Sequence, residues 1–175
     1  MFKFFLYRNH NFRVEAGKLG RFCGLWARIF CAFLPVLAGC RLVPRLPPVD
    51  LSAAGWKTYQ GQAVWRTERN APEIAGELLL ATNSTGSAFV QFTKTPLPFI
   101  VAQSTASAWE LHSVPDNKTY SGRGAPPVKA LWLWLPVCLA GAPPQGSLSW
   151  QRLENNGWRL ENRATGEFLE GYLSQ

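Results

Sequence analysis

The chain has 175 residues, of which 47% are hydrophobic and 13% aromatic, and its formal net charge is +7. Basic proteins often bind nucleic acid or anionic surfaces. However, residues 1–39 hold six of the eighteen Lys and Arg and only one of the eleven Asp and Glu, which leaves twelve basic and ten acidic residues in 40–175. This nearly balanced remainder argues against nucleic-acid binding.

Residues 1–39 have the organisation of a secretory signal peptide. Basic residues up to Arg28 precede the apolar run 29–37, and Ala38 and Gly39 supply the small residues of a cleavage site. The run is too short to cross a bilayer as a helix, which needs about 20 residues. The alternatives are a signal peptide cut at a different kind of site and an N-terminal anchor helix.

Residues 40–55 are interpreted as a tether, because 41–50 contain three prolines and no hydrophobic periodicity. The remaining 56–175 are enough for one domain that buries roughly two-thirds of its unfolded surface. No internal repeat or second domain is visible in this part of the sequence.

From Trp56 onward, apolar and polar residues alternate in short segments separated by turn residues. This pattern predicts an antiparallel sheet with one apolar and one polar face. The expected turns lie at 115–117, 155–157 and 165–166. The apolar positions of the expected strands are Gly61, Ala63, Trp65, Ile74, Gly76, Leu78, Leu80, Ala88, Val90, Phe92, Trp109, Leu111, Leu148, Trp150, Trp158 and Leu160.

The segment 125–135 breaks this alternation and predicts a short helix that is hydrophobic nearly all round. Its leading prolines suit the first turn of a helix, and Pro136 is expected to end or kink it. Trp132 and Trp134 would lie roughly 200° apart around the helix. We therefore expect one of them to face the sheet and the other to lie at a rim, against a partner or in solvent.

Catalytic and metal-binding motifs are absent from the sequence. Once a signal peptide is removed, Cys138 and His112 are the remaining candidates for a nucleophile and a base, since Cys40 would be modified. Neither belongs to a recognisable motif, and Cys138 is most simply a small buried hydrophobe. We expect no enzymatic activity, no cofactor and no metal.

The order of these features resembles the LolB and LolA family of lipoprotein-localisation proteins. Leu37-Ala-Gly-Cys40 is similar to the bacterial lipobox, which implies lipidation of Cys40. The turn 115–118 before Tyr120 and the segment 127–134 resemble the family's hairpin and helical lid. The resemblance implies a mainly β fold, an incomplete antiparallel barrel whose short helical lid covers an apolar cavity.

The resemblance also implies a function. The protein would be anchored to the outer membrane, facing the periplasm, and would accept lipoprotein acyl chains from a periplasmic LolA-like carrier and help insert them into outer-membrane lipid. Leu97, between two prolines, corresponds to the leucine that the family presents to the membrane, although folding of Leu97 back onto the core is an equal alternative. We expect a monomer. The candidate acyl-chain-binding residues are Trp65, Leu78, Leu80, Val90, Phe92, Trp109, Leu131, Trp132, Trp134, Leu135 and Trp150.

Two other functions fit the same pattern. The helix could cover the sheet fully, which would give an ordinary filled core. The protein would then be a structural or assembly lipoprotein of the envelope that docks a protein partner through a sheet edge or through Trp132 and Trp134. An inhibitor of a periplasmic enzyme is a further alternative, which would require a polar protruding loop.

Overall fold

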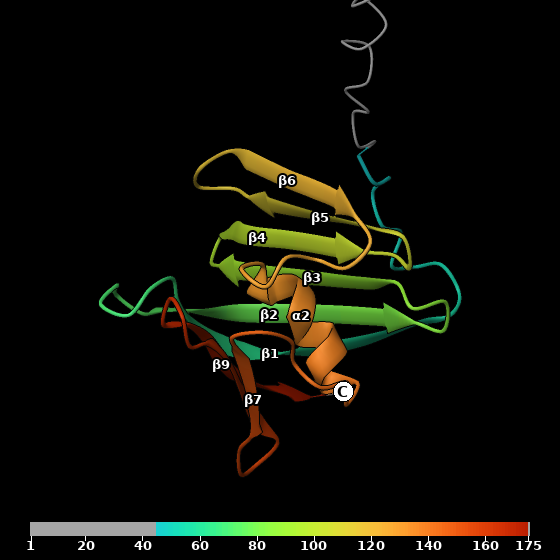
Figure 1. Cartoon of the computed structure of the whole chain (residues 1–175). Coiled ribbons are helices and arrows are strands. Elements are labelled where there is room, and N and C mark those ends of the chain that lie inside the picture. The colour runs from blue at the N-terminus through green and yellow to red at the C-terminus, as the bar shows by residue number, and fades with distance from the viewer. Residues whose placement is uncertain (1–44, 175) are drawn as a thin grey trace, which may run out of the picture. The chain divides into compact units, whose positions relative to one another are not determined.

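The computed structural model describes residues 45–174. They form one open sheet of antiparallel strands in the order β6-β5-β4-β3-β2-β1-β9-β8-β7, with a single short helix, α2, against one face (Figure 1). The predicted fold class, a mainly β incomplete barrel with a helical lid, is confirmed. The elements are β1 (Trp56–Arg66), β2 (Ile74–Asn83), β3 (Ala88–Lys94), β4 (Leu97–Ser104), β5 (Ala108–Ser113), β6 (Lys118–Arg123), α2 (Leu131–Leu139), β7 (Leu148–Arg152), β8 (Gly157–Asn162) and β9 (Glu167–Ser174).

The alternation of the sequence sets the two faces of the sheet. The face covered by α2, here called the inner face, carries the predicted apolar positions, and cross-strand pairs such as Leu78 with Phe92 and Leu80 with Val90 place them side by side. These four side chains are almost completely buried. The predicted turn at 155–157 is also present, because Asn155 and Asn156 both have positive φ, as the two central residues of a type I′ hairpin turn require.

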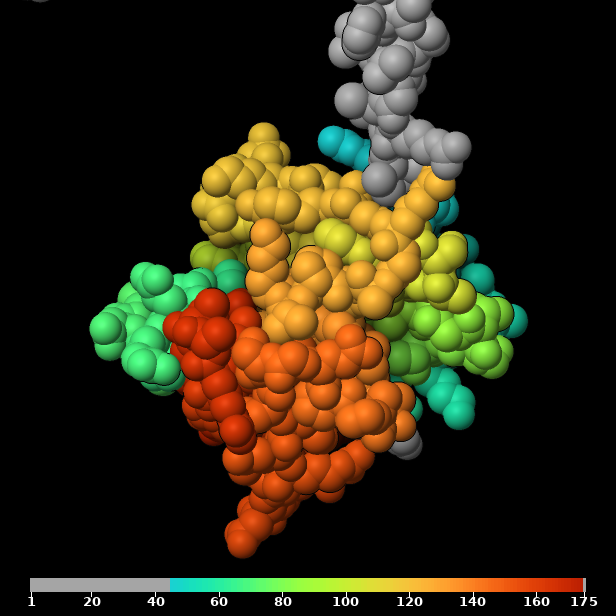
Figure 2. Space-filling model, viewed as in Figure 1, coloured from blue at the N-terminus to red at the C-terminus, as the bar shows by residue number. Residues whose placement is uncertain are grey.

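The first and last strands pair with each other, so β1 joins the two halves of the sheet. Two glycines allow their close approach. A Cβ atom on Gly61 would overlap the carbonyl oxygen of Tyr172, and one on Gly171 would overlap the carbonyl oxygen of Gln62. Beyond this junction, β7 runs steeply across the direction of β2 (Figure 1). The sheet therefore curls around α2, whose atoms and flanking loops fill the middle of the inner face (Figure 2).

The helix begins later than predicted, and of the two alternatives for Pro136 the structure excludes the one in which this residue ends the helix. It begins at Leu131, after a turn in which the Ala130 N–H donates to the carbonyl oxygen of Pro127, and Pro136 lies inside it. Proline removes one backbone hydrogen bond from a helix, and burial of the surrounding side chains stabilises the helix despite that loss. The helix ends at Leu139 in a Schellman motif, in which Gly141 has positive φ and the Ala142 N–H donates to the Val137 carbonyl.

The prediction that Trp132 and Trp134 would differ in burial is also wrong. Their exposed fractions are 2% and 3%. Trp132 faces the sheet and packs against Phe92, with ring centroids 5.0 Å apart. Trp134 is covered by the segment that precedes the helix, and its indole N–H donates to the Pro127 carbonyl at 3.2 Å. Trp134 is therefore bonded to the chain itself and does not lie at a rim or in solvent.

The segment around Leu97 is not a loop. Leu97 is the first residue of β4 and pairs with Lys94 across the two-residue turn Thr95–Pro96. The register shifts between Phe92 and Thr93, which pair with Ile100 and Pro98, so one extra residue bulges from β4. Prolines are tolerated at strand starts and bulges. Pro96 and Pro98 can therefore flank Leu97, the first residue of β4.

The predicted tether is described only from residue 45 onward. Residues 45–50 form neither helix nor strand, but they are attached to the outer face of the sheet, opposite α2. The Leu46 N–H donates to Glu110 Oε2 at 3.0 Å, and Gln103 Nε2 donates to the Leu46 carbonyl at 3.4 Å. The proposed signal peptide, 1–39, and the proposed lipidation site, Cys40, lie outside the described residues.

Within residues 45–174, no helix has the length and hydropathy that crossing a bilayer requires.

Candidate functional site

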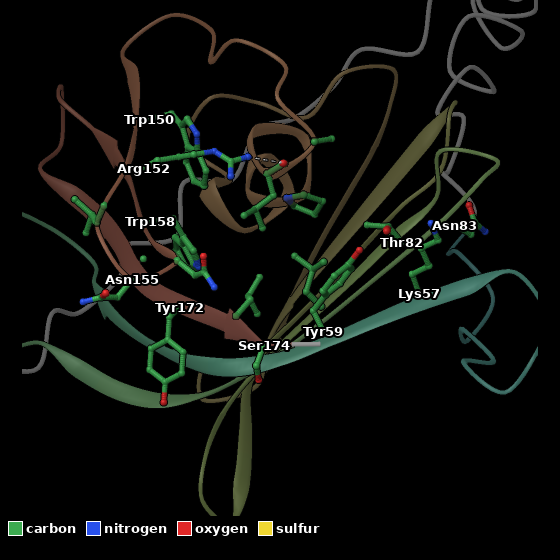
Figure 3. Close-up of a pocket in the computed structure, with 18 of the residues that line it drawn as sticks. Lys57, Tyr59, Thr82, Asn83, Trp150, Arg152, Asn155, Trp158, Tyr172 and Ser174 are labelled. Atoms are coloured by element: carbon green, nitrogen blue, oxygen red, sulfur yellow. Dashed lines mark hydrogen bonds between the residues drawn. The ribbon is translucent and has the colours of Figure 1, made fainter.

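A cleft of about 1060 Å³ opens on the inner face, between the C-terminal part of α2 and the strands β1, β2, β7, β8 and β9 (Figure 3). The curl of the sheet creates it, because β7 and β8 rise on one side while β1 and β2 continue on the other. The helix is too short to fill the whole space between them. The cleft is therefore the part of the inner face that the lid leaves uncovered.

About half of the residues that line the cleft are aromatic or aliphatic, and most of the others are polar. Leu80 and Trp158 are buried in its floor, and Tyr59 stands beside them from β1. Trp150 stacks on Trp158, with ring centroids 6.2 Å apart and an interplanar angle of 14°. Leu139 closes the side formed by the helix. Such rigid rings and branched chains make a surface on which a flexible apolar ligand can be buried.

Of the eleven candidate acyl-chain-binding residues, only Leu80 and Trp150 line this cleft. Most of the others form a packed core beneath the N-terminal part of the helix, where Trp132 lies 5.5 Å from Trp65 and 5.0 Å from Phe92 between ring centroids. Trp109 is half-buried on β5, against Gly122. The remaining members of the packed core are Leu78, Val90, Leu131, Trp134 and Leu135.

Several lining residues were not among the sequence candidates. Tyr59 and Leu173 each lie two residues from a glycine of the β1–β9 junction, so the period of two would have placed both on the inner face. Leu139 was missed because the helix was expected to end or kink at Pro136. Trp158 is predicted on the apolar face but is not among the candidate binding residues. The neighbouring sequence does not show whether a tryptophan on this face lines a cleft or packs in the core.

The mouth of the cleft carries positive charge. Its charged lining residues are Lys57 on β1 and Arg152 on β7, and no Asp or Glu is among the described residues that line it. Arg152 Nη2 donates to the Leu139 carbonyl at 3.4 Å, which links β7 to the C-terminal end of α2. A cation at this end of a helix also interacts favourably with the helix dipole.

One carboxyl group of the inner face has a perturbed acidity. Glu167 accepts a hydrogen bond from the Trp65 indole N–H at 3.1 Å. Burial raises the pKa of Glu167 to about 7, and this hydrogen bond opposes part of the rise because it favours the charged form. Glu167 is not a lining residue of the cleft, and Trp65, which it holds, packs against Trp132 of the lid.

Cys138 and His112 do not form a catalytic pair. Cys138 is completely buried in α2 on the inner face, as predicted, and burial raises the pKa of its thiol to about 11. His112 lies on the outer face of β5, where Nδ1 is 3.0 Å from Thr119 Oγ1. The part of the chain that the structure describes also contains no group of three His, Cys, Asp or Glu that could hold a metal ion.

Leu97 is exposed at the tip of the β3–β4 hairpin, with an exposed fraction of 63%. The alternative in which it folds back onto the core is therefore wrong. The register places this tip at one end of the strands and the cleft at the other. Thr93, close to the tip, pairs with Glu77, whereas the cleft is lined by Thr82 and Asn83 at the far end of β2.

No protein-family model and no curated protein sequence matches this chain.

Proposed function

We propose that the domain binds acyl chains in the cleft, as part of a LolB-like transfer of lipoproteins to the outer membrane. The observation that carries this proposal is the open cleft with its aromatic floor, which lies next to the lid and is large enough for a lipid chain. Transfer of each methylene group from water into such a site gains about 0.8 kcal/mol. Binding of this kind requires no nucleotide and no catalytic residue.

Transfer follows from differences in affinity. A receptor that holds the acyl chain more tightly than a periplasmic carrier draws cargo from it, and a lipid bilayer that holds the chain more tightly still receives it. Lipidation of Cys40 would keep the receptor at the outer membrane. Exposed Leu97 would then enter the lipid surface at the moment of delivery, because its side chain has no packing to lose.

A fluorescent fatty acid titrated into the purified domain tests the binding step. We expect saturable binding that is lost in Leu173→Trp, because the larger side chain on β9 occupies the cleft. Tyr120→Trp on β6 is the matched control, since Tyr120 is exposed and does not line the cleft. Circular dichroism would establish that both variants fold. Absence of saturable binding, or equal binding by Leu173→Trp, would contradict the proposal.

The packed core favours a second candidate function. Trp132, Trp65 and Phe92 fill the space beneath the N-terminal part of the lid, as they would in an envelope lipoprotein with a structural role. Depletion of the protein in cells separates the two candidates. Accumulation of other lipoproteins away from the outer membrane supports transfer, whereas correct localisation of lipoproteins together with loss of a bound protein partner supports the structural role.

A further inference from the structure

We propose that the cleft selects single-chain amphiphiles with an anionic head group, a carboxylate or a phosphate, and that the positive charge of Lys57 and Arg152 at the mouth favours this head group. The inference rests on the proposed binding of acyl chains in the cleft and adds a substrate class to it. The negative charge of the head group distinguishes such a ligand from a neutral amphiphile of equal chain length.

The first argument is the distribution of charge. Of the arginines in the described residues, Arg159 and Arg66 are paired with carboxylates. Arg159 Nη1 lies 2.7 Å from Glu170 Oε2, and Arg66 Nη1 lies 3.9 Å from Glu73 Oε1. Lys57 and Arg152 form no ion pair with any residue that the structure describes, and the described lining of the cleft contributes no carboxylate. Two uncompensated cations at the mouth of a cleft with an apolar floor attract an anion.

The second argument is the hydrogen-bonding capacity of the lining. Arg152 uses one of its five N–H donors on the Leu139 carbonyl. The side-chain oxygen of Asn83 already accepts hydrogen bonds from Thr85 and Ser87, so its amide N–H groups are the part left for a ligand. A ligand that only accepts hydrogen bonds, as carboxylates and phosphates do, complements such a set of donors.

The third argument is the placement of these groups. Figure 3 shows Arg152 reaching from β7 toward the helix and Lys57 on the opposite side, with Tyr59 and Trp158 between them. Both cations are solvent-exposed, whereas Leu80 and Trp158 are buried deeper in the cleft. An amphiphile would therefore bury its chain against the floor and keep its head group at the rim, where the charge stays partly hydrated and costs little to bind.

The test is displacement of the neutral fluorophore N-phenyl-1-naphthylamine by four ligands of equal chain length. Two are anionic, a fatty acid and a lysophosphatidylglycerol, and two carry no net charge, a fatty alcohol and a lysophosphatidylcholine. We expect the anionic ligands to bind about tenfold more tightly at low salt, with the difference shrinking as ionic strength rises. The relative affinities of the two anionic ligands distinguish a carboxylate from a phosphate ligand.

The variants Arg152→Gln and Lys57→Gln test whether these two residues cause the preference for anionic ligands. Lys118→Gln on β6 is the control, because Lys118 lies outside the cleft. We expect each cleft variant to weaken anionic ligands about three- to tenfold while the fatty alcohol binds unchanged. Equal affinity of all four ligands, or equal weakening of neutral and anionic ligands by both variants, would overturn the head-group proposal while leaving acyl-chain binding intact. Failure of all four ligands to displace the fluorophore, together with no binding of the fluorophore itself, would overturn acyl-chain binding as well.

Discussion

At the scale of single residues, Leu97 stands out because it is a large hydrophobic side chain with an exposed fraction of 63%. It forms no part of the core, so Leu97→Glu should change the free energy of unfolding by less than about 0.5 kcal/mol. We expect the variant to bind a fluorescent fatty acid normally but to deliver it to lipid vesicles more slowly, because a carboxylate does not enter the apolar part of a bilayer.

Tyr120→Glu is the control for this prediction, since Tyr120 is also exposed but lies on β6. Equal loss of binding and delivery in Leu97→Glu would remove the proposed role of Leu97 in the membrane step.

Glu167 gives the stability of the domain a predictable dependence on pH. Its pKa in the folded state, about 7, is above the ordinary value for glutamate, so the folded state holds the proton more tightly than the unfolded state. The favourable contribution is fully present below about pH 4.5 and is lost as the pH rises through 7. Glu167→Gln removes this titration and keeps an oxygen that can accept the Trp65 hydrogen bond.

We expect Glu167→Gln to be more stable than the natural chain by about 1–3 kcal/mol at pH 8 and to differ little at pH 4. Urea unfolding followed by tryptophan fluorescence at both pH values measures this difference. A constant difference between the two proteins across this range would show that Glu167 titrates normally.

At the scale of elements, the lid should be stabilised by packing rather than by its own helical preference. The helix has nine residues, an internal proline and no side-chain N-cap, so it is too short to be stable alone. Trp132→Ala should lower the free energy of unfolding by about 3–5 kcal/mol, because it leaves a cavity next to Phe92 and Trp65.

Trp150→Ala is the comparison for the lid prediction. Trp150 is only half-buried and faces the open cleft, so its removal should cost distinctly less stability but should weaken acyl-chain binding. Denaturant unfolding measures the loss of stability in each variant, and ligand titration measures the loss of binding. Together they show whether each tryptophan acts in the core or in the cleft. A similar loss of stability in the two variants would mean that the cleft is closed in solution.

The same elements show what sequence patterns determine and what they do not. A strand with one solvent-facing side has polar and apolar residues in alternation along its sequence. This alternation is why β1, β2 and β3 and their inner faces are predicted correctly. β4 was missed because Leu97–Val101 is a continuous apolar run with a proline, and only pairing with β3 and β5 makes it a strand. The helix continues past Pro136 because burial, a tertiary effect, outweighs the local influence of this proline, and it begins late because residues 127–130 form a turn.

The cleft could be predicted only in part for a related reason. The alternation of polar and apolar residues identifies which side chains face inward. It does not show whether an inward side chain packs under α2 or lies beyond the end of α2, in the cleft. Phe92 and Leu80 have the same pattern in the sequence, yet only Leu80 lines the cleft. The difference depends on the length of α2 and on the close approach of β1 and β9 at Gly61 and Gly171, which are properties of the assembled sheet.

At the scale of the whole domain, the attachment of residues 45–50 to the outer face limits the reach of any anchor at Cys40. The six residue-to-residue steps from Cys40 to Leu46 span at most about 20 Å when fully extended. Release of the segment back to Trp56 would add roughly 30 Å. The contacts of Leu46 with Glu110 and Gln103 therefore decide how far the cleft can move from the membrane if Cys40 is lipidated.

The double variant Glu110→Ala with Gln103→Ala tests whether this attachment holds in solution. It removes both hydrogen-bond partners of Leu46, so trypsin should cut the Arg45–Leu46 bond several-fold faster, because a protease needs an unpaired extended segment. The free energy of unfolding of the rest of the domain should change by less than about 1 kcal/mol, since both side chains lie on the outer face. Glu154→Ala in the β7–β8 turn is the control, and mass spectrometry identifies the cut. An unchanged rate would mean that residues 45–50 are already free in the natural chain, and the cleft would then have the full reach of the tether.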